Sequence, residues 1–458
     1  GTPAILEQLA QDITGWDALA VEYFQLLATT QYLNHLRLQN ISFTGLLSWE
    51  LLEYINTPFD KTARTADVRR IESNRGKYNI PGIGIHLWRI QAFAATHAPA
   101  YRHDERRFSF NALGRDTPLY NRHLPETDVA ELAGRQHVSM PLSRRVAGEY
   151  LETYYGKEKS ILIYRDDVPV MPGTFSSPAT ALSDIISICN LSDIKDSSGN
   201  VTGWMNMPSV KIAIDPVLGR IAFPAPVPVN VNIYTNYFYG FSAEMGGGEY
   251  NRVATFTPEL EKIQLIHVPG GMTSINDALQ ALALTGGVLE LEENEYYIET
   301  PVIRVAAGKH IEIRAADSKR AVWVLDGDLN VSGDADAAVT FNGILFSGGC
   351  IRVPAATATG LENELGTLTL QHCTLLPGSS PVIKSSPAAP DQPRLIIEAA
   401  VTAVVISNSI CGAVRVREDA HAAIDNSIID AGAEEGVAYA APDGTATGAP
   451  LVIKNSNV

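Results

Sequence analysis

Cysteine is scarce in this chain of 458 residues, and its four copies lie far apart, at Cys189, Cys350, Cys373 and Cys411. A zinc site or a disulfide framework shows closely spaced cysteines such as a CxxC pair, and none occurs here. The spacing therefore favours buried, reduced thiols in a cytosolic product. The sequence identifies no metal ligand, no cofactor-binding residue and no catalytic residue.

Long apolar runs are also absent. No stretch approaches the roughly 18 residues that are needed to cross a bilayer, so no membrane span is expected. The first residues, Gly1-Thr-Pro-Ala4, do not form a basic segment followed by an apolar one. A secretory signal is therefore not visible, and cytoplasmic synthesis is the expectation.

Basic residues are outnumbered overall, because the formal net charge is −16. One segment departs from this balance: residues 60–145 contain 15 Lys and Arg against 9 Asp and Glu, or +6, which leaves −22 for the remainder. An acidic protein with one basic module is a poor candidate for nucleic-acid binding. The basic segment is either a solvated face or a surface that meets an acidic neighbouring subunit.

The first 59 residues are predicted to be helical. The run from Trp16 to Arg37 contains no Gly or Pro, and its apolar residues recur near helical spacing. A second, shorter helix is expected at 46–55, before Asn56-Thr-Pro58. The wide apolar face of these helices needs a partner, either inside the domain or in an assembly.

Residues 60–250 read as a β-rich α+β domain. Alternation predicts strands at IGIHLW (83–88), 160–164, 185–191, 210–214 and 225–241, with a helix at 143–155. In KIAIDPVLGRIAF (211–223), two alternating runs flank Asp215-Pro-Val-Leu-Gly219, whose early Pro and late Gly predict the turn of a hairpin.

The glycines of GFSAEMGGGEYNR (240–252) match neither a P-loop nor a dinucleotide-binding loop. Glu244 and Glu249 flank them and would repel a phosphate. A flexible or left-handed joint between two architectures is the preferred interpretation, and a partner contact is the alternative. Residues 251–271 are then expected to be a linker.

Residues 272–458 are predicted to form a right-handed, single-stranded parallel β-helix. A short helix and a Gly-Gly pair that ends it come first. A four-residue motif then recurs every 18 to 36 residues: an apolar residue, any residue, Asn or His, and Ser or Cys. Such repetition is typical of a solenoid, whose coils bury their strands by stacking. Asn tolerates a left-handed corner, so Asn408, Asn426 and Asn455 are expected to stack as a ladder.

Two resemblances follow from these residues. Segment 273–325 (TSINDALQALALTGGVLELEENEYYI and onward) resembles the opening of a pectin-lyase-like β-helix, which implies a fold rather than an activity. The segments YFQLLATTQYLNHLR, GKYNIPGIGIHLWRIQ, IAIDPVLGRIAF and YGFSAEMGGGEYNR resemble an uncharacterised bacterial family associated with phage-tail-like contractile injection systems. That second resemblance implies a structural part of a baseplate, fibre or arm within an assembled or released particle.

The resemblance implies other subunits of a tail-like particle as partners, with self-association and carbohydrate binding left open. A tailspike-like protein that binds or cleaves glycans on a β-helix face is the alternative function. The chain ends at Val458, directly after the ladder phrase Asn455-Ser-Asn457 and without a polar cap. We therefore expect either a truncated chain or an end that another chain covers.

Several charged residues are candidates for chemistry. The candidate carboxylates of the β-helix are Asp326, Asp328, Asp334 and Asp336, whose Asp-Gly-Asp and Gly-Asp-Ala-Asp motifs favour turns, and Asp425 and Asp430 near the asparagine ladder. Arg415 and Arg417 alternate on one strand and are expected on the outer surface. The pairs Arg69-Arg70, Arg106-Arg107 and Arg144-Arg145 make either structural ion pairs or contacts with an acidic subunit. Aromatic residues, which line carbohydrate grooves, are sparse in the β-helix.

Overall fold

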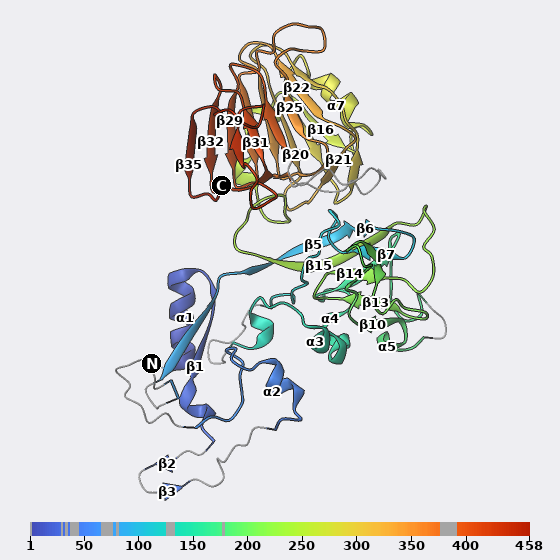
Figure 1. Cartoon of the computed structure of the whole chain (residues 1–458), viewed down its shortest axis with the longest axis vertical. Helices are drawn as coiled ribbons and strands as arrows, with labels where there is room; N and C mark the ends of the chain where they lie inside the picture. Colours follow the sequence, from blue (N-terminus) through green and yellow to red (C-terminus); the bar gives the residue numbers. More distant parts are fainter. Residues whose placement is uncertain are drawn as a thin grey trace. The chain divides into compact units, whose positions relative to one another are not determined.

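The computed structural model describes residues 2–28, 31–32, 35–36, 45–65, 77–78, 82–124, 133–175, 179–375 and 392–458. These residues form two compact units (Figure 1). The first unit comprises Gly1–Ala92 and Asn121–Met140, and the second comprises Phe93–Tyr120 and Pro141–Val458. Strands predominate in the second unit, and no helix in the described ranges combines the length and the apolar character of a transmembrane helix. The four domain ranges expected from the sequence stay predictions.

The first unit is built around a two-stranded sheet and a helix. Helix α1 (Pro3–Thr14) ends at Gly15, whose backbone is left-handed (φ 70°) and whose N–H donates to the carbonyl of Gln11 at 2.7 Å. Strand β1 (Asp17–Glu22) then pairs antiparallel with β4 (Ile83–Trp88). The remaining elements are η1 (Tyr23–Leu26), β2 (Gln31–Tyr32), β3 (His35–Leu36), α2 (Trp49–Glu53) and η4 (Arg135–His137).

The helix predicted over Trp16–Arg37 is therefore wrong, whereas the short helix at 46–55 and the strand at 83–88 are confirmed. All six residues of β1 pair with β4, and this long-range pairing outweighs the helical spacing of the apolar residues. The left-handed Gly15 also ends the preceding helix immediately before this strand. Local periodicity could not reveal a partner strand about 60 residues away.

The second unit begins with an α+β part, here residues 93–120 and 141–250. A five-stranded sheet has the order β10-β13-β14-β7-β6, and a four-stranded sheet has the order β5-β15-β8-β9. The predicted hairpin is confirmed, because β13 and β14 pair antiparallel and Gly219 turns the chain at φ 63°. The strands are β5 (Gln91–Pro99), β6 (Tyr101–Arg102), β7 (Arg107–Ser109), β8 (Leu162–Arg165), β9 (Val168–Pro169), β10 (Ile186–Ile188), β11 (Asp193–Lys195), β12 (Val201–Trp204), β13 (Ile212–Asp215), β14 (Arg220–Ala222) and β15 (Ile233–Phe241).

The helix predicted at 143–155 is confirmed as two short pieces, α3 (Arg144–Glu149) and α4 (Leu151–Tyr154). The hydroxyl of Ser143 caps the first piece by accepting the N–H of Val146 at 3.2 Å. Another short helix, α5 (Leu182–Ile185), leads directly into β10. These helices border the core that the two sheets enclose.

The rest of the second unit is a parallel β-helix, here residues 265–454, which confirms the predicted solenoid. Strands of three sheets follow one another in turn along the chain, and every pairing within these sheets is parallel. The eight-stranded sheet contains β16 (Leu265–Val268), β17 (Gly287–Leu291), β20 (His310–Ala315), β23 (Ala338–Asn342), β26 (Thr367–Gln371), β29 (Ala403–Ser407), β32 (His421–Asp425) and β35 (Leu451–Lys454).

Two six-stranded sheets complete each coil. One contains β18 (Tyr296–Ile298), β21 (Val322–Leu325), β24 (Leu345–Gly348), β27 (Thr374–Leu375), β30 (Ile410–Gly412) and β33 (Ile428–Asp430). The other contains β19 (Ile303–Val305), β22 (Leu329–Gly333), β25 (Ile351–Val353), β28 (Leu395–Ile397), β31 (Val414–Val416) and β34 (Tyr439–Ala440). In Figure 1 the strands stack side by side along one axis, so each coil buries its apolar residues against the next.

The predicted short helix is confirmed as α7 (Ile275–Leu282), which packs on the first strands of the β-helix. Its apolar residues Ile275, Leu279 and Leu282 are buried in the solenoid core. The carboxylate of Glu299 accepts the N–H groups of Ile275 and Asn276 at 2.9 and 3.0 Å, so it caps the helix N-terminus. The preceding residues form η5 (Val253–Thr255) and α6 (Pro258–Glu261).

The predicted stack of asparagines is confirmed at the corner between the eight-stranded sheet and the six-stranded sheet that begins with β18. Asn408, Asn426 and Asn455 are all left-handed, with φ between 44° and 48°. The same corner holds Ser318, Gly343 and His372 in the earlier coils, also at positive φ. The serine after each asparagine makes the hydrogen bonds between successive coils. Ser427 Oγ accepts the N–H of Ser409 at 3.1 Å, and Ser456 Oγ accepts that of Ser427 at 3.0 Å. The hydrogen-bonded ladder is therefore formed by serine hydroxyls and backbone N–H groups beside the asparagines.

Candidate functional site

The glycine-rich loop packs closely against the β-helix corner. Gly246 is left-handed (φ 75°), as the sequence indicated, and its N–H donates to the carbonyl of Asn408 at 2.7 Å. The N–H of Gly247 donates to Thr374 Oγ1 at 3.0 Å. A side chain on Gly247 would overlap Leu345, so glycine allows the close approach. These contacts favour a fixed junction over a flexible one.

Two buried arginines hold this junction, which we call the seam: residues 246–252 and 320 with the β-helix turns beside them. Arg252, 1% exposed, donates to the carbonyls of Gly248, Ala316 and Lys319, the last two at 2.9 and 3.0 Å. Arg320 donates to the carbonyl of Gly247 at 3.3 Å and to the hydroxyl of Tyr237 at 3.2 Å. Each guanidinium thus links the α+β part to the β-helix by hydrogen bonds.

A cavity of about 660 Å³, the seam cavity, opens beside these contacts. Its lining comes from β5, β15, the β8–β9 turn, the loop after the glycines and the first two turns of the β-helix. The lining residues are Thr96, His97, Asp167, Tyr234, Glu249, Glu293, Asn294, Glu295, Ser318 and Lys319. Cavities of this size hold small molecules, so the seam cavity is our candidate site.

His97 and Tyr234 form an aromatic wall of the seam cavity. Their rings stack with centroids 4.3 Å apart and planes 19° apart. His97 Nε2 lies 3.4 Å from the carboxylate of Asp167, and the His97 backbone is left-handed at φ 47°. The N–H of His97 donates to Asn236 Oδ1 at 2.7 Å, which holds this unusual conformation in place.

Two of the cavity carboxyls are partly withdrawn from water. Burial raises the pKa of the Glu249 carboxyl, which accepts the N–H of Thr96 at 2.5 Å and the side chain of Asn294 at 3.1 Å. Burial also raises the pKa of the Glu295 carboxyl, which hydrogen-bonds to the hydroxyl of Tyr234. Raised carboxyl pKa values in a cavity are a recognised signal of a functional site.

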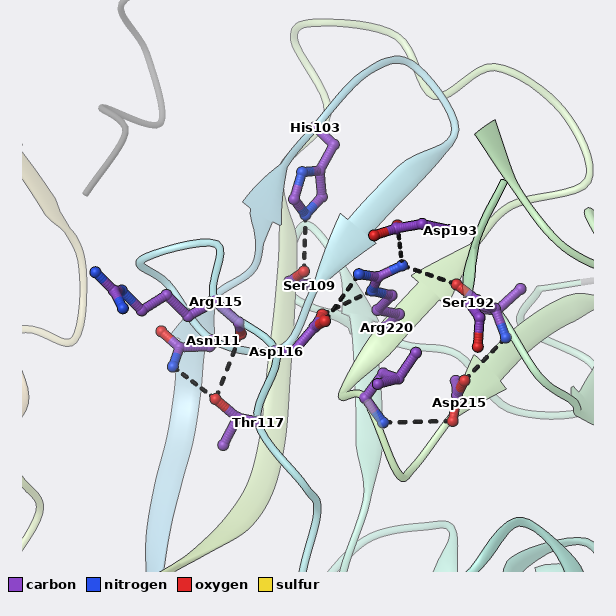
Figure 2. A network of polar contacts seen from close by, with 12 residues as sticks. His103, Ser109, Asn111, Arg115, Asp116, Thr117, Ser192, Asp193, Asp215 and Arg220 are labelled. Carbon is purple, nitrogen blue, oxygen red and sulfur yellow. Dashed lines mark hydrogen bonds and ion pairs between the residues drawn. The ribbon is translucent and has the colours of Figure 1, made fainter. Parts of the chain in front are cut away.

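A second polar network, in the α+β part, is a structural cluster (Figure 2). Arg220, 7% exposed, donates to Asp116 at 2.7 and 2.8 Å and to Asp193 at 2.6 Å, and it lies over the ring of Trp204. His103 Nε2 lies 2.8 Å from Ser109 Oγ, and burial lowers the His103 pKa to about 4. Ser109 is fully buried on β7, so its hydroxyl is not accessible to a substrate.

Four of the candidate β-helix carboxylates lie at turns, as the sequence indicated, whereas Asp425 and Asp430 end strands β32 and β33. Asp326 and Asp328 lie between β21 and β22, and Asp334 and Asp336 lie between β22 and β23. Asp328 accepts a hydrogen bond from Arg352 at 3.0 Å, and Asp430 accepts the N–H of Gly432 at 2.8 Å. Within the described ranges, no three His, Cys, Asp or Glu side chains are placed to hold a metal ion.

The arginines divide between surface and interior positions. Arg415 was expected on the surface but is 7% exposed, because it donates to the carbonyls of Val414 and Val437 at 3.0 Å each and the loop before β34 covers it. Arg107 pairs with Asp104 at 2.6 Å and Arg144 with Asp215 at 2.8 Å, which supports the ion-pair interpretation. Arg106 donates to two carbonyls instead. Arg69 and Arg70 lie outside the described residues.

All four cysteines are free thiols, and Cys350, Cys373 and Cys411 are buried as expected. Burial raises the pKa of each of these three to about 12. They are therefore protonated and poorly nucleophilic at neutral pH.

Sequence reasoning did not find the seam cavity, because its residues come from six separate stretches that no motif connects. Comparison with known proteins gives no further guide: the chain matches no family model, no curated protein and no solved structure.

Proposed function

We propose that this protein is a structural component of a phage-tail-like contractile injection particle, in which the β-helix serves as a rigid arm. In this proposal the β-helix is right-handed and pectin-lyase-like, and the first unit attaches the arm to other subunits. The resemblance of the sequence segments quoted above motivates the identity of the particle. The structural support comes from the surface of the first unit.

The observation that carries the proposal is that the first unit exposes large apolar side chains and buries a charged one. Helix α1 buries the carboxylate of Glu7, which accepts the N–H of Ala20 at 2.8 Å, and exposes Ile5, Leu9 and Ile13. Ala18 and Ala20 of β1 are buried, yet their partners on the same face of β4, Leu87 and Ile85, are exposed. An exposed apolar face of this kind is typical of an interaction surface.

A rigid arm also requires a firm base. The buried arginines and glycines of the seam fix the β-helix to the α+β part, and parallel pairing continues from β16 to β35. Loads applied to the solenoid would therefore be passed to the globular part through hydrogen bonds rather than through a loose linker.

Light scattering of the full chain tests the proposal. We expect a defined oligomer, and we expect the triple variant Ile83→Thr/Ile85→Thr/Leu87→Thr to be monomeric because threonine keeps the strand but removes apolar area. The control Val210→Thr/Val229→Thr changes exposed apolar residues of the second unit and should leave the oligomer intact. A monomeric wild-type chain, or equal loss in the control, would contradict attachment through this face.

The glycan-active alternative remains a weaker proposal. Trp323, Phe341 and Phe346, half of the β-helix aromatics, lie in the core, where they cannot stack on a sugar. A glycan-array screen would test this alternative independently of the oligomeric state.

A further inference from the structure

The seam cavity combines features that suit one class of ligand. Four carboxylates line it, from Asp167, Glu249, Glu293 and Glu295, and the one fixed cation among its lining residues is Lys319. The formal charge of the lining is thus −3 when His97 is neutral. A complementary ligand is therefore positively charged and carries hydrogen-bond donors.

The carboxylates are spread along the walls of the cavity. Asp167 lies at the β8–β9 turn, Glu249 follows the glycine loop, and Glu293 and Glu295 lie in the turn between β17 and β18. A ligand that reaches all of these positions at once must be extended and must carry more than one charge. A volume of about 660 Å³ accommodates a flexible molecule of that length.

The aromatic wall gives an independent reason for an organic cation. His97 stacks on Tyr234, and the ring of Tyr164 meets His97 edge-on with centroids 5.1 Å apart. Rings pack against methylene segments, and ring faces that are not covered by a stacked neighbour attract ammonium groups. A chain of methylenes between ammonium groups matches a cavity that has both carboxylates and rings.

We propose that the seam cavity binds an organic polycation of the polyamine class. The ammonium groups pair with the carboxylates of Glu293, Glu295 and Asp167, and the methylene segments lie along the His97–Tyr234 wall. This function is additional to the structural role proposed above and does not depend on the oligomeric state. Bound polyamine would join the β8–β9 turn to the first turn of the β-helix and so reinforce the seam.

The ionisation of the cavity provides a second readout. Burial raises the pKa of the Glu249 and Glu295 carboxyls, so these groups keep their protons to a higher pH than an exposed glutamate does. A bound polycation favours the ionised forms, so binding should release protons. Calorimetric heats measured below neutral pH should then depend on the ionisation enthalpy of the buffer.

Isothermal titration calorimetry of the full chain with spermidine, at pH 7.5 and low salt, tests the proposal. The double variant Asp167→Asn/Glu293→Gln removes two charges at exposed positions, so folding should be preserved. We expect about tenfold weaker binding, the loss of about 1.4 kcal/mol that two exposed ion pairs contribute. The matched control Glu434→Gln/Glu435→Gln removes two exposed charges from the loop after β33 and should bind like wild type.

Three results would overturn the proposal. The first is no spermidine binding by the wild-type chain, and the second is equal weakening in the control, which would indicate attraction by net charge alone. The third is displacement of spermidine by Mg²⁺ at matched charge concentration, which would indicate a metal-ion site. Thermal melts of both variants establish that any loss of binding is not caused by unfolding.

Discussion

The first unit and the β-helix use apolar residues in opposite ways. In β20 of the solenoid, Ile311 and Ile313 are fully buried in the core, and the polar Glu312 between them is buried as well. In β4 of the first unit, Ile83 and Ile85 alternate just as regularly, yet each is almost half exposed. The same period-two pattern thus marks a completed core in one region and an uncovered face in the other.

This difference shows that a strand pattern predicts which residues share a face but not whether that face is covered. Each β-helix strand has neighbours on both sides in its own sheet, apart from the terminal ones, so stacking provides the cover. Among the described residues, the β1–β4 sheet of the first unit has two strands, and two strands rarely bury a face on their own. Its apolar residues on β4 are therefore left exposed, because the described residues of the chain do not cover them.

Removing a core aromatic should give the largest contrast between the two regions. Trp323 is fully buried and stacks on Phe346 with centroids 5.6 Å apart. We expect Trp323→Ala to lower the free energy of unfolding by about 3–5 kcal/mol, because it leaves a large cavity. Ile85→Ala in the first unit should cost less than about 0.5 kcal/mol in the monomer. Differential scanning calorimetry distinguishes the two, and a similar cost for both would show that β4 is covered within one chain.

A smaller effect should follow from filling the close approach at the seam. In Gly247→Ala, the new methyl group would overlap Leu345 and lie 3.1 Å from the carbonyl oxygen of Gly343. We expect a loss of about 1–3 kcal/mol, the usual cost of overpacking. The control Gly203→Ala has no atom within 4 Å of the added carbon. If both variants melted alike, the seam would be looser than its contacts indicate.

The smallest effect should be a change in pH dependence at the β-helix corner. Burial, with a contribution from Arg252, lowers the His372 pKa to about 4, whereas the unfolded chain has a value near 6.5. The folded protein binds fewer protons, so this stability is complete above about pH 6.5 and declines as the pH falls towards 4. His372→Asn, which suits the left-handed corner, should reduce the drop in melting temperature between pH 7.5 and 4.5. An unchanged drop, with His421→Asn as the exposed control, would contradict this assignment.

The sequence predicted the β-helix well because its signals are local and repeated. Asn408, Asn426 and Asn455 each mark a left-handed corner, and the motif of Asn followed by Ser recurs in the last three coils. The hairpin at 211–223 was predictable for the same reason, since turn chemistry and strands lie within a few residues of each other.

The first strand and the seam cavity were not predictable because both depend on distant residues. Strand β1 forms through pairing with β4, which overrides the helical spacing between Trp16 and Glu22. In the cavity, His97 meets Asp167 and Tyr234 through a fold that joins three separate segments. The excess of basic residues in 60–145 predicts a solvated face or a surface that meets an acidic subunit. Arg107 and Arg144 instead form ion pairs within the fold.

The position of the glycine loop has a consequence for how such arms vary in length. The loop contacts the corner at Gly343, His372 and Asn408, whereas Asn426 and Asn455 lie in later coils. A coil inserted beyond Asn426 would leave those contacts unchanged and extend the solenoid by one strand spacing, about 4.8 Å. Attachment and reach are thus separable: duplication of a single coil adjusts how far the arm extends while its mounting stays the same.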